Sequence, residues 1–341
     1  MLGRFLLDVI KHAFGAAGAP RSAQPAAMGA SAPGQVIPLD GVRCLVKSRH
    51  GWFLANRYDR YIGAALIRYG ECGEIEQSFV ASLLGSGDGA IDVGANIGVH
   101  TVGMSRAVGP TGTVVAVEAQ PAIFQVLCAN LALNGLLNVR PHECGCGAQA
   151  GSLLVPIVDY GSPTVHNSGA LSLARAGPGM KVGVVPLDDL AGDISSLRLI
   201  KVDVEGMEKE VLQGAAGVIE RHRPLLYLEN DRPENSRDLI EWIVGLGYRL
   251  WWHAPRLFNP QNFFGVGEND YPSVMSLNMF CQPAEAALEP ATKGLAEITD
   301  PDHHPLRGRN PGCPTSSESG LQRSANSPFS AASWRPDSAS A

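Results

Sequence analysis

The sequence predicts an α/β protein built around a doubly wound, mostly parallel sheet. Two observations support this prediction. Short, continuously apolar strands alternate along the chain with amphipathic helical segments, and a turn with two glycines follows one of these strands. Unbroken apolar strands are buried on both faces, which is typical of parallel sheets covered by helices.

The first half of the predicted domain shows this alternation clearly. Residues 74–84 place Ile75, Phe79, Val80, Leu83 and Leu84 on one helical face, residues 90–94 form a short apolar strand, and a helix begins near Val99. Residues 113–119 form the next strand. Pro121 suits the first turn of the helix that follows, which ends at Asn134-Gly135.

The alternation continues in the second half. Residues 197–206 read as a strand and residues 207–220 as a helix. The inner face of this helix is expected to carry Met207, Val211, Leu212, Ala215 and Ile219. A further strand is predicted at 224–230 and a helix at 234–246.

Composition divides the chain into three parts. Residues 1–36 form an extension that includes an Ala/Gly/Pro/Ser-rich linker, 37–284 form the folded domain, and 285–341 form a tail expected to be disordered, with His303-His304 exposed in it. Residues 2–10 carry apolar side chains on one helical face. They are read either as a short helix packed on its own domain or as a helix that touches a membrane surface or partner weakly.

The overall charge and the cysteines narrow the class of protein. The formal net charge is -6, so nucleic acid is not an expected partner. No apolar run reaches the ~20 residues of a membrane span, so no transmembrane segment is predicted. The seven cysteines are irregularly spaced, which favours reduced, mostly buried thiols in a cytoplasmic protein.

The turn at residues 90–98, AIDVGANIG, suggests what the sheet binds. Gly94 and Gly98 allow a tight turn against a ligand, Asp92 lies at the end of the strand, and Glu118 ends the next strand, where it can accept hydrogen bonds from ribose hydroxyls. A nicotinamide or flavin dinucleotide favours three glycines in the pattern G-x-G-x-x-G, and its pyrophosphate would be repelled by Asp92. The cationic amino-acid end of S-adenosylmethionine would be attracted, so the charge favours this methyl donor.

The sequence resembles the FkbM family of S-adenosylmethionine-dependent methyltransferases over roughly residues 65–283. The resemblance is carried by IDVGANIGVHT, VVAVEAQP and above all LIKVDVEGMEKEVLQGA at 199–215. It implies a Rossmann-like class I methyltransferase fold and methyl transfer, most often to an oxygen of a sugar or polyketide.

The resemblance also implies roles for individual residues. Asp92, Gly94, Asn96 and Gly98 would line the methionine end of the donor, and Glu118 would hold its ribose. The adenine contact departs from the usual pattern, and Glu143 or Cys144 could supply it.

The candidates for the catalytic base are acidic residues and one histidine. In an extended strand Lys201, Asp203 and Glu205 point to one face. Asp203 is the first choice for base or acceptor-orienting residue, Glu205 the second and Glu229 the third, although Lys201 could simply pair with one of the acids. His253 is a further candidate, because a histidine titrates near neutral pH. No cluster of metal-binding residues stands out, and no metal is predicted.

Three functions follow as hypotheses. The leading one is an S-adenosylmethionine-dependent O-methyltransferase whose acceptor is a hydroxyl of a sugar, glycolipid, lipo-oligosaccharide or natural product. The alternatives are a nicotinamide-dependent oxidoreductase and a non-catalytic S-adenosylmethionine-binding scaffold whose tails bind a partner.

Overall fold

The structure, a computed structural model, describes residues 36–157, 159–161 and 179–307. The predictions for the N-terminal extension, its linker and its surface helix therefore lie outside the described residues, as does the tail from residue 308 onward.

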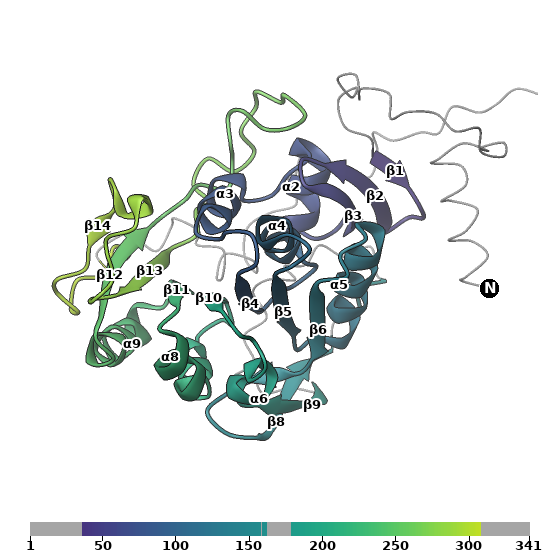
Figure 1. Ribbon diagram of the computed structural model, residues 1–341. Helices are drawn as coiled ribbons and strands as arrows, with labels where there is room; N and C mark the ends of the chain where they lie inside the picture. Colours follow the sequence, from purple (N-terminus) through teal and green to yellow (C-terminus); the bar gives the residue numbers. More distant parts are fainter. Residues whose placement is uncertain (1–35, 158, 162–178, 308–341) are drawn as a thin grey trace, which may run out of the picture. The chain divides into compact units, whose positions relative to one another are not determined.

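A sheet of eight strands forms the centre of the domain, in the order β14-β12-β13-β11-β10-β4-β5-β6 (Figure 1). The strands are β4 (Gly89–Val93), β5 (Thr113–Glu118), β6 (Val139–Glu143), β10 (Leu197–Val202), β11 (Leu225–Glu229), β12 (Tyr248–His253), β13 (Asn278–Pro283) and β14 (Ala296–Glu297). The strands from β11 to β6 pair in parallel, whereas β13 runs antiparallel between β11 and β12. The predicted doubly wound, mostly parallel sheet is confirmed.

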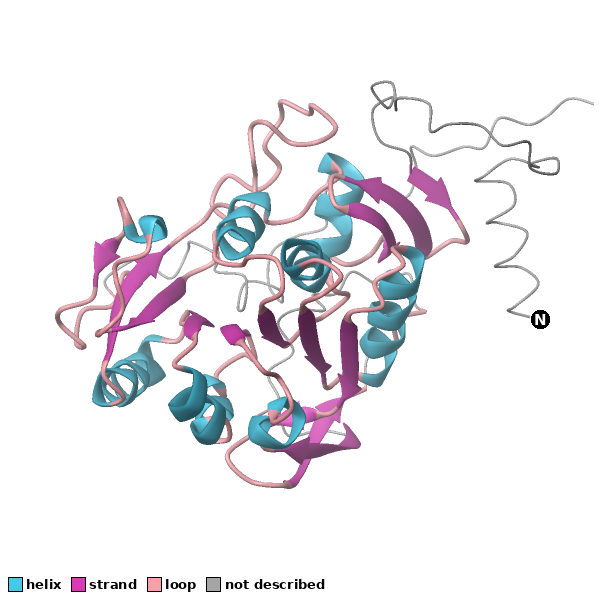
Figure 2. Cartoon of the chain, in the orientation of Figure 1, coloured by secondary structure: helices cyan, strands magenta, loops and turns pink. Residues whose placement is uncertain are grey.

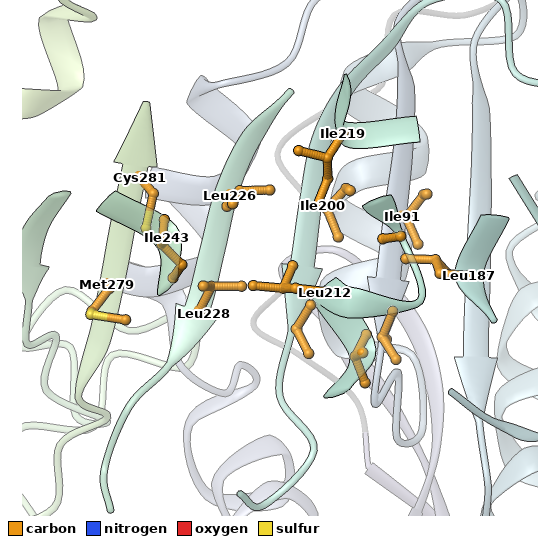
Figure 3. Packing of buried hydrophobic residues seen from close by; sticks show 14 of the residues in the cluster. Ile91, Leu187, Ile200, Leu212, Ile219, Leu226, Leu228, Ile243, Met279 and Cys281 are labelled. Atoms are coloured by element: carbon orange, nitrogen blue, oxygen red, sulfur yellow. The ribbon is translucent and has the colours of Figure 1, made fainter. Parts of the chain in front are cut away.

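Helices cover both faces of this sheet, because the side chains of each strand alternate between two hydrophobic clusters. On β4, Ile91 belongs to the cluster that includes Leu212 and Ile219, and Ala90 to the cluster that includes Met104. Figure 3 shows the first of these clusters, where Leu187 and Ile243 also meet the strands. The helices are α3 (Glu74–Ser82), α4 (Val99–Val108), α5 (Pro121–Leu133), α6 (Leu187–Ala191), α7 (Glu208–Gln213), α8 (Ala216–His222) and α9 (Pro233–Gly245).

Two small sheets that the sequence reading did not anticipate complete the described part (Figure 2). One is antiparallel, with β1 (Val36–Pro38), β2 (Arg43–Ser48) and β3 (Gly51–Asn56), and is followed by α2 (Ile62–Tyr69). The other joins β7 (Gly145–Cys146), β9 (Gly179–Val185) and β8 (Gly151–Pro156). The first packs its buried side chains against Ile97, Val99 and Ile123, so it lies beside the glycine turn.

Two predicted elements are shorter than expected. Strand β10 ends at Val202, and the chain turns at Glu205 and Gly206, whose φ angles are +59° and +106°. The predicted helix 207–220 is divided into α7 and α8 near Gly214. A Cβ on Gly214 would lie 2.1 Å from the backbone oxygen of Gly147, so this glycine allows a close contact between two backbones.

The face of α3 differs from its prediction in a way that matters for the site. Ile75 is exposed, whereas Glu76 and Gln77 are buried. The apolar periodicity suggested the opposite, because hydrophobic patterning assumes that a charged side chain prefers water. Here Glu76 faces a cavity instead.

The described structure extends further towards the C-terminus than the composition predicted. Residues 285–307 are part of the described structure, and β14 pairs with β12 through Trp251 and Trp252. His304, expected to be exposed, is buried and its Nε2 lies 3.0 Å from the backbone oxygen of Asn230. A few ordered contacts suffice to hold a polar segment that composition alone would class as disordered.

Within the described residues, no helix combines the length and the apolarity that a bilayer crossing needs. The six cysteines there are free, and four of them, Cys44, Cys72, Cys146 and Cys281, are buried, as the irregular spacing predicted.

Candidate functional site

A cavity of about 200 Å³ opens at the carboxyl ends of β4, β5, β10 and β11. This is the position where ligands bind in open α/β sheets. Asn96, Glu118, Asp203 and Glu229 contribute to its wall from the ends of these strands. Its remaining wall comes from segments outside the parallel strands, including Tyr61, Leu257, Val274 and Met275.

The turn after β4 follows the bottom of the cavity and is held tightly. The backbone nitrogens of Gly94 and Ala95 both donate to the Val117 oxygen, at 2.9 Å. Gly94 has a φ of +81°, and a Cβ there would lie 1.8 Å from the backbone oxygen of Asp203. The turn therefore passes so close to the end of β10 that only glycine fits, and its backbone is exposed to any ligand in the cavity.

Glu118, at the end of β5, fastens the turn and also faces the cavity. Its carboxylate accepts hydrogen bonds from the backbone nitrogens of Asn96, at 2.9 Å, and Gln120, at 2.8 Å. Burial raises the pKa of this carboxyl group to about 7, although both hydrogen bonds act to lower it. Each oxygen keeps a lone pair that could accept a hydrogen bond from a hydroxyl group of a ligand.

Asp92 is not among the residues that line the cavity, and its expected contact with the donor stays a prediction. Its side chain is fully buried, accepts a hydrogen bond of 2.6 Å from the Thr101 hydroxyl, and lies 3.5 Å from the Lys201 ammonium group. Burial disfavours the charge of Lys201, but Asp203 and Asp92 outweigh it, so the pKa of Lys201 is raised. The sequence had left open the alternative that Lys201 pairs with an acidic residue, and the structure shows such pairs.

Two further predicted donor contacts lie outside the cavity wall. Gly98 precedes α4 and packs against Leu127, which a Cβ would approach to 2.8 Å. Glu143 pairs with Glu118 in the register of β5 and β6, but its side chain is exposed and does not line the cavity. Cys144, the other residue named for the adenine contact, does line it. The chain reaches the cavity one residue after the end of β6, at Cys144.

Three carboxylates converge at the carboxyl ends of β10 and β11 and form what we call the acidic edge: Asp203, Glu205 and Glu229. One carboxylate oxygen from each lies within 4.8 Å of the others. The Asp203 side chain is 38% exposed, and its carboxylate is 3.5 Å from Lys201. Burial, Asp203 and Asp231 raise the pKa of Glu205 to about 8, even though Arg232 forms an ion pair with it.

Glu76 and His100 also line the cavity, and the sequence reading did not propose Glu76 as a site residue. His100 Nε2 lies 3.6 Å from the Glu76 carboxylate. Burial raises the pKa of Glu76 to about 7, which Lys201 only partly opposes, and burial lowers the pKa of His100. Glu74 and Glu76 both lie in the first turn of this helix, and nothing in the sequence distinguishes the buried one.

The buried Glu76 predicts a pH-dependent stability. Its pKa is about 7 in the folded protein and ~4.3 when unfolded, so the folded state alone holds this proton between those values. Its stabilising contribution is complete below the unfolded pKa and is lost as the pH rises to the folded one. We expect the free energy of unfolding of Glu76→Gln, measured in urea without ligand, to rise relative to that of the wild type by on the order of 3 kcal/mol as the pH goes from 4.5 to 8.

The exposed Glu220 supplies the matched control, since Glu220→Gln should follow the wild-type pH profile. Parallel profiles for Glu76→Gln and the wild type would show that Glu76 is ionised throughout.

His253 is not part of the cavity wall, so the geometry does not bring this candidate base to the other site residues. Burial lowers its pKa to about 4, and its ring packs on Phe79, with 4.2 Å between centroids. The Tyr227 hydroxyl accepts a hydrogen bond from the Asn278 amide and lies 2.8 Å from His253 Nδ1. These contacts hold the ring at the edge of the core.

The residues that line the cavity suit S-adenosylmethionine. Gly94, Ala95 and Asn96 of the turn lie in the cavity wall, where their backbone can contact a ligand. Glu118 offers acceptor lone pairs for ribose hydroxyls, and the acidic edge favours the positive charge of the sulfonium and amino groups. A pyrophosphate would meet the same carboxylates unfavourably.

Comparison with known proteins agrees with this geometry. Residues 92–250 match the model of the family described as methyltransferase FkbM domain. Methyltransferase 1 of Beauveria bassiana is 32% identical over 142 residues, 36% of this chain and 57% of the relative. Methyltransferase sdnD of Sordaria araneosa is 32% identical over 186 residues, 45% of this chain and 70% of the relative. The chain thus spans little more than half of the first relative.

Among solved structures, methyltransferase FkbM from Methylobacillus flagellatus is 20% identical, with a TM-score of 0.39, over 57% of this chain and 43% of that one. At that TM-score the likeness carries no weight in the assignment. The family match and the sdnD relative do carry it, and they set aside the alternative of a nicotinamide-dependent oxidoreductase. The chain belongs to the FkbM family of S-adenosylmethionine-dependent methyltransferases.

Proposed function

We propose that this protein methylates an oxygen: a hydroxyl of a sugar, glycolipid, lipo-oligosaccharide or natural product. The observation that supports this most is the contact between the donor turn and the acidic edge. Gly94 lies directly against the backbone of Asp203, whose carboxylate is the most exposed of the three. A hydroxyl acceptor has to lose a proton next to the donor, and this is where a carboxylate is available.

The roles of the chain's own residues follow from their positions. S-adenosylmethionine, when bound, supplies a methyl group on a positively charged sulfur. Glu118 accepts hydrogen bonds from the ribose hydroxyls of the donor, and the turn at Gly94 and Asn96 lies beside the methionine end of the donor. Asp203 orients the acceptor hydroxyl and accepts its proton, and Glu76 is a second acceptor of suitable pKa, about 7.

The outer wall of the cavity supports an acceptor with an apolar face. Tyr61 enters it next to α2, whereas Leu257, Val274 and Met275 come from the segment between β12 and β13. Apolar and aromatic side chains of this kind cover the face of a sugar ring or a polyketide, while the acidic edge orients its hydroxyl.

The setting of the reaction is part of the proposal. The net charge of -6 favours a small-molecule or glycan acceptor over nucleic acid. The free thiols of the described residues favour the reducing environment of the cytoplasm.

Asp203→Asn tests the proposed chemistry. We expect it to lower kcat at least about 100-fold while the calorimetric Kd for S-adenosylhomocysteine changes less than about threefold, because Asn keeps the shape but cannot take a proton. Transfer of tritiated methyl groups to fractionated sugars, glycolipids and polyketides provides the activity readout. Glu220→Gln, an exposed acid on α8, is the control.

The results separate the remaining alternatives. Binding of S-adenosylhomocysteine without transfer to any oxygen acceptor would favour the non-catalytic scaffold. An unchanged kcat in Asp203→Asn would remove Asp203 from the chemistry.

A further inference from the structure

We propose that Asp203, Glu205 and Glu229 bind one divalent cation of the hard, oxygen-preferring class, Mg²⁺ or Mn²⁺, in the wall of the cavity. The three residues come from two neighbouring parallel strands. Asp203 and Glu205 follow the end of β10, and Glu229 is the last residue of β11. All three line the same cavity.

The distances fit such an ion. One carboxylate oxygen from each residue lies within 4.8 Å of the others. Oxygen ligands at about 2.1 Å from Mg²⁺ lie roughly 3 to 4 Å apart, so small side-chain rotations would bring the three oxygens into coordination. The half-exposed Asp203 leaves the remaining positions open to water or a substrate oxygen.

A second observation, independent of the clustering, concerns Glu229. Its side chain is buried, with 7% of the residue exposed, and its Oε2 has no hydrogen-bond partner. Buried carboxylate oxygens are nearly always satisfied, since an unpaired one loses its hydration without compensation. Because this residue belongs to the convergent group, a cation at the acidic edge would provide the partner that Glu229 lacks.

The basic side chains near the acidic edge are too few to pair with all of its carboxyl groups. Lys201 interacts electrostatically with Asp203, Asp92, Glu76 and Glu229, and Arg232 with Asp231, Glu205, Glu229 and Glu208. Two basic side chains thus face seven carboxyl groups. Lys201 is directed to Asp92 and Asp203, and Arg232 to Glu205, so neither satisfies Glu229.

The competing occupants of the acidic edge are protons. A carboxylate has to be ionised to bind a metal, so the ion would displace any proton held at the acidic edge. Cation and proton therefore make opposite predictions for a metal titration.

An ion at this place would act on the acceptor as a Lewis acid, which makes a hydroxyl easier to deprotonate. This role rests on the proposed function. The binding itself does not, because it can be measured with neither donor nor acceptor present.

The test uses the full chain after treatment with a chelator and its removal. Free Mn²⁺ is followed by electron paramagnetic resonance during a titration. We expect one Mn²⁺ per chain with a Kd below about 100 μM, and at least about tenfold weaker binding in Glu229→Gln and Asp203→Asn. Glu220→Gln should bind as the wild type does.

Thermal unfolding without metal shows that the variants are folded. Mn²⁺ should raise the Tm of the wild type and of Glu220→Gln equally, and that of Glu229→Gln clearly less, because a ligand stabilises a protein in proportion to its binding.

Binding weaker than about 1 mM, or equal binding by Glu229→Gln and the wild type, would overturn the site and leave the acidic edge balanced by protons. Mn²⁺ binding together with methyl transfer that does not respond to the metal would retain the site and remove its role in the reaction. Absence of methyl transfer with Mn²⁺ binding intact would count against the proposed function alone.

Discussion

Replacing Gly94 with alanine is expected to abolish measurable binding of the methyl donor, with a loss in affinity of at least about 100-fold. Two effects add up. A φ of +81° strains any residue with a Cβ, and the new atom would lie 1.8 Å from the backbone oxygen of Asp203. The turn would have to move away from β10, which displaces both walls of the cavity. Calorimetry with S-adenosylhomocysteine measures the loss.

Gly135 provides the matched control. Its φ is also positive, +64°, but no atom lies within 4 Å of the position of its Cβ. Gly135→Ala should therefore lose about 1 kcal/mol of stability from the backbone strain alone and bind the donor normally. If both variants bind equally well, the cavity does not depend on the close approach of the Gly94 turn to β10.

The second large effect concerns folding. Lys201→Met should lower the free energy of unfolding by about 3–5 kcal/mol, because it leaves the buried carboxylate of Asp92 without its counter-charge. Lys201 is 2% and Asp92 0% exposed, and the two groups are 3.5 Å apart. Urea unfolding at pH 7 measures the change, and the exposed Lys293→Met should leave stability nearly unaltered.

A double variant tests the cause. Adding Asp92→Asn to Lys201→Met removes the stranded charge while the amide oxygen can still accept from the Thr101 hydroxyl. Part of the lost stability, on the order of 1–3 kcal/mol, should return. If the two substitutions are simply additive, Lys201 stabilises the sheet through packing and not through its charge.

Part of the cavity wall could be predicted from the sequence because its determinants are local. Gly94 and Glu118 lie at the ends of apolar strands, and parallel strands bring their carboxyl ends to one edge. The structure places both in the cavity wall, together with Asn96. The direction of a side chain at such an edge could not be predicted from the sequence. Asp92 points to Thr101 and Lys201, and Glu143 points outward.

The acidic edge could be predicted from the sequence only in part. Asp203 and Glu205 were expected on one face of a straight strand. The strand ends at Val202, and the two residues reach the cavity through a turn with a positive φ at Glu205. Glu76 was missed because its helix is separated from these residues by more than 100 positions in the chain.

The sequence by itself determined the alternation of strands and helices, the parallel core and the glycine turn, since these depend on hydrophobic period and backbone freedom within a few residues. Only the tertiary structure decided that β13 runs antiparallel between β11 and β12, that residues 285–307 join the domain, and that Glu229 converges with Asp203 and Glu205. The energies of such contacts depend on groups far apart in the chain, whose distances and burial no local pattern records.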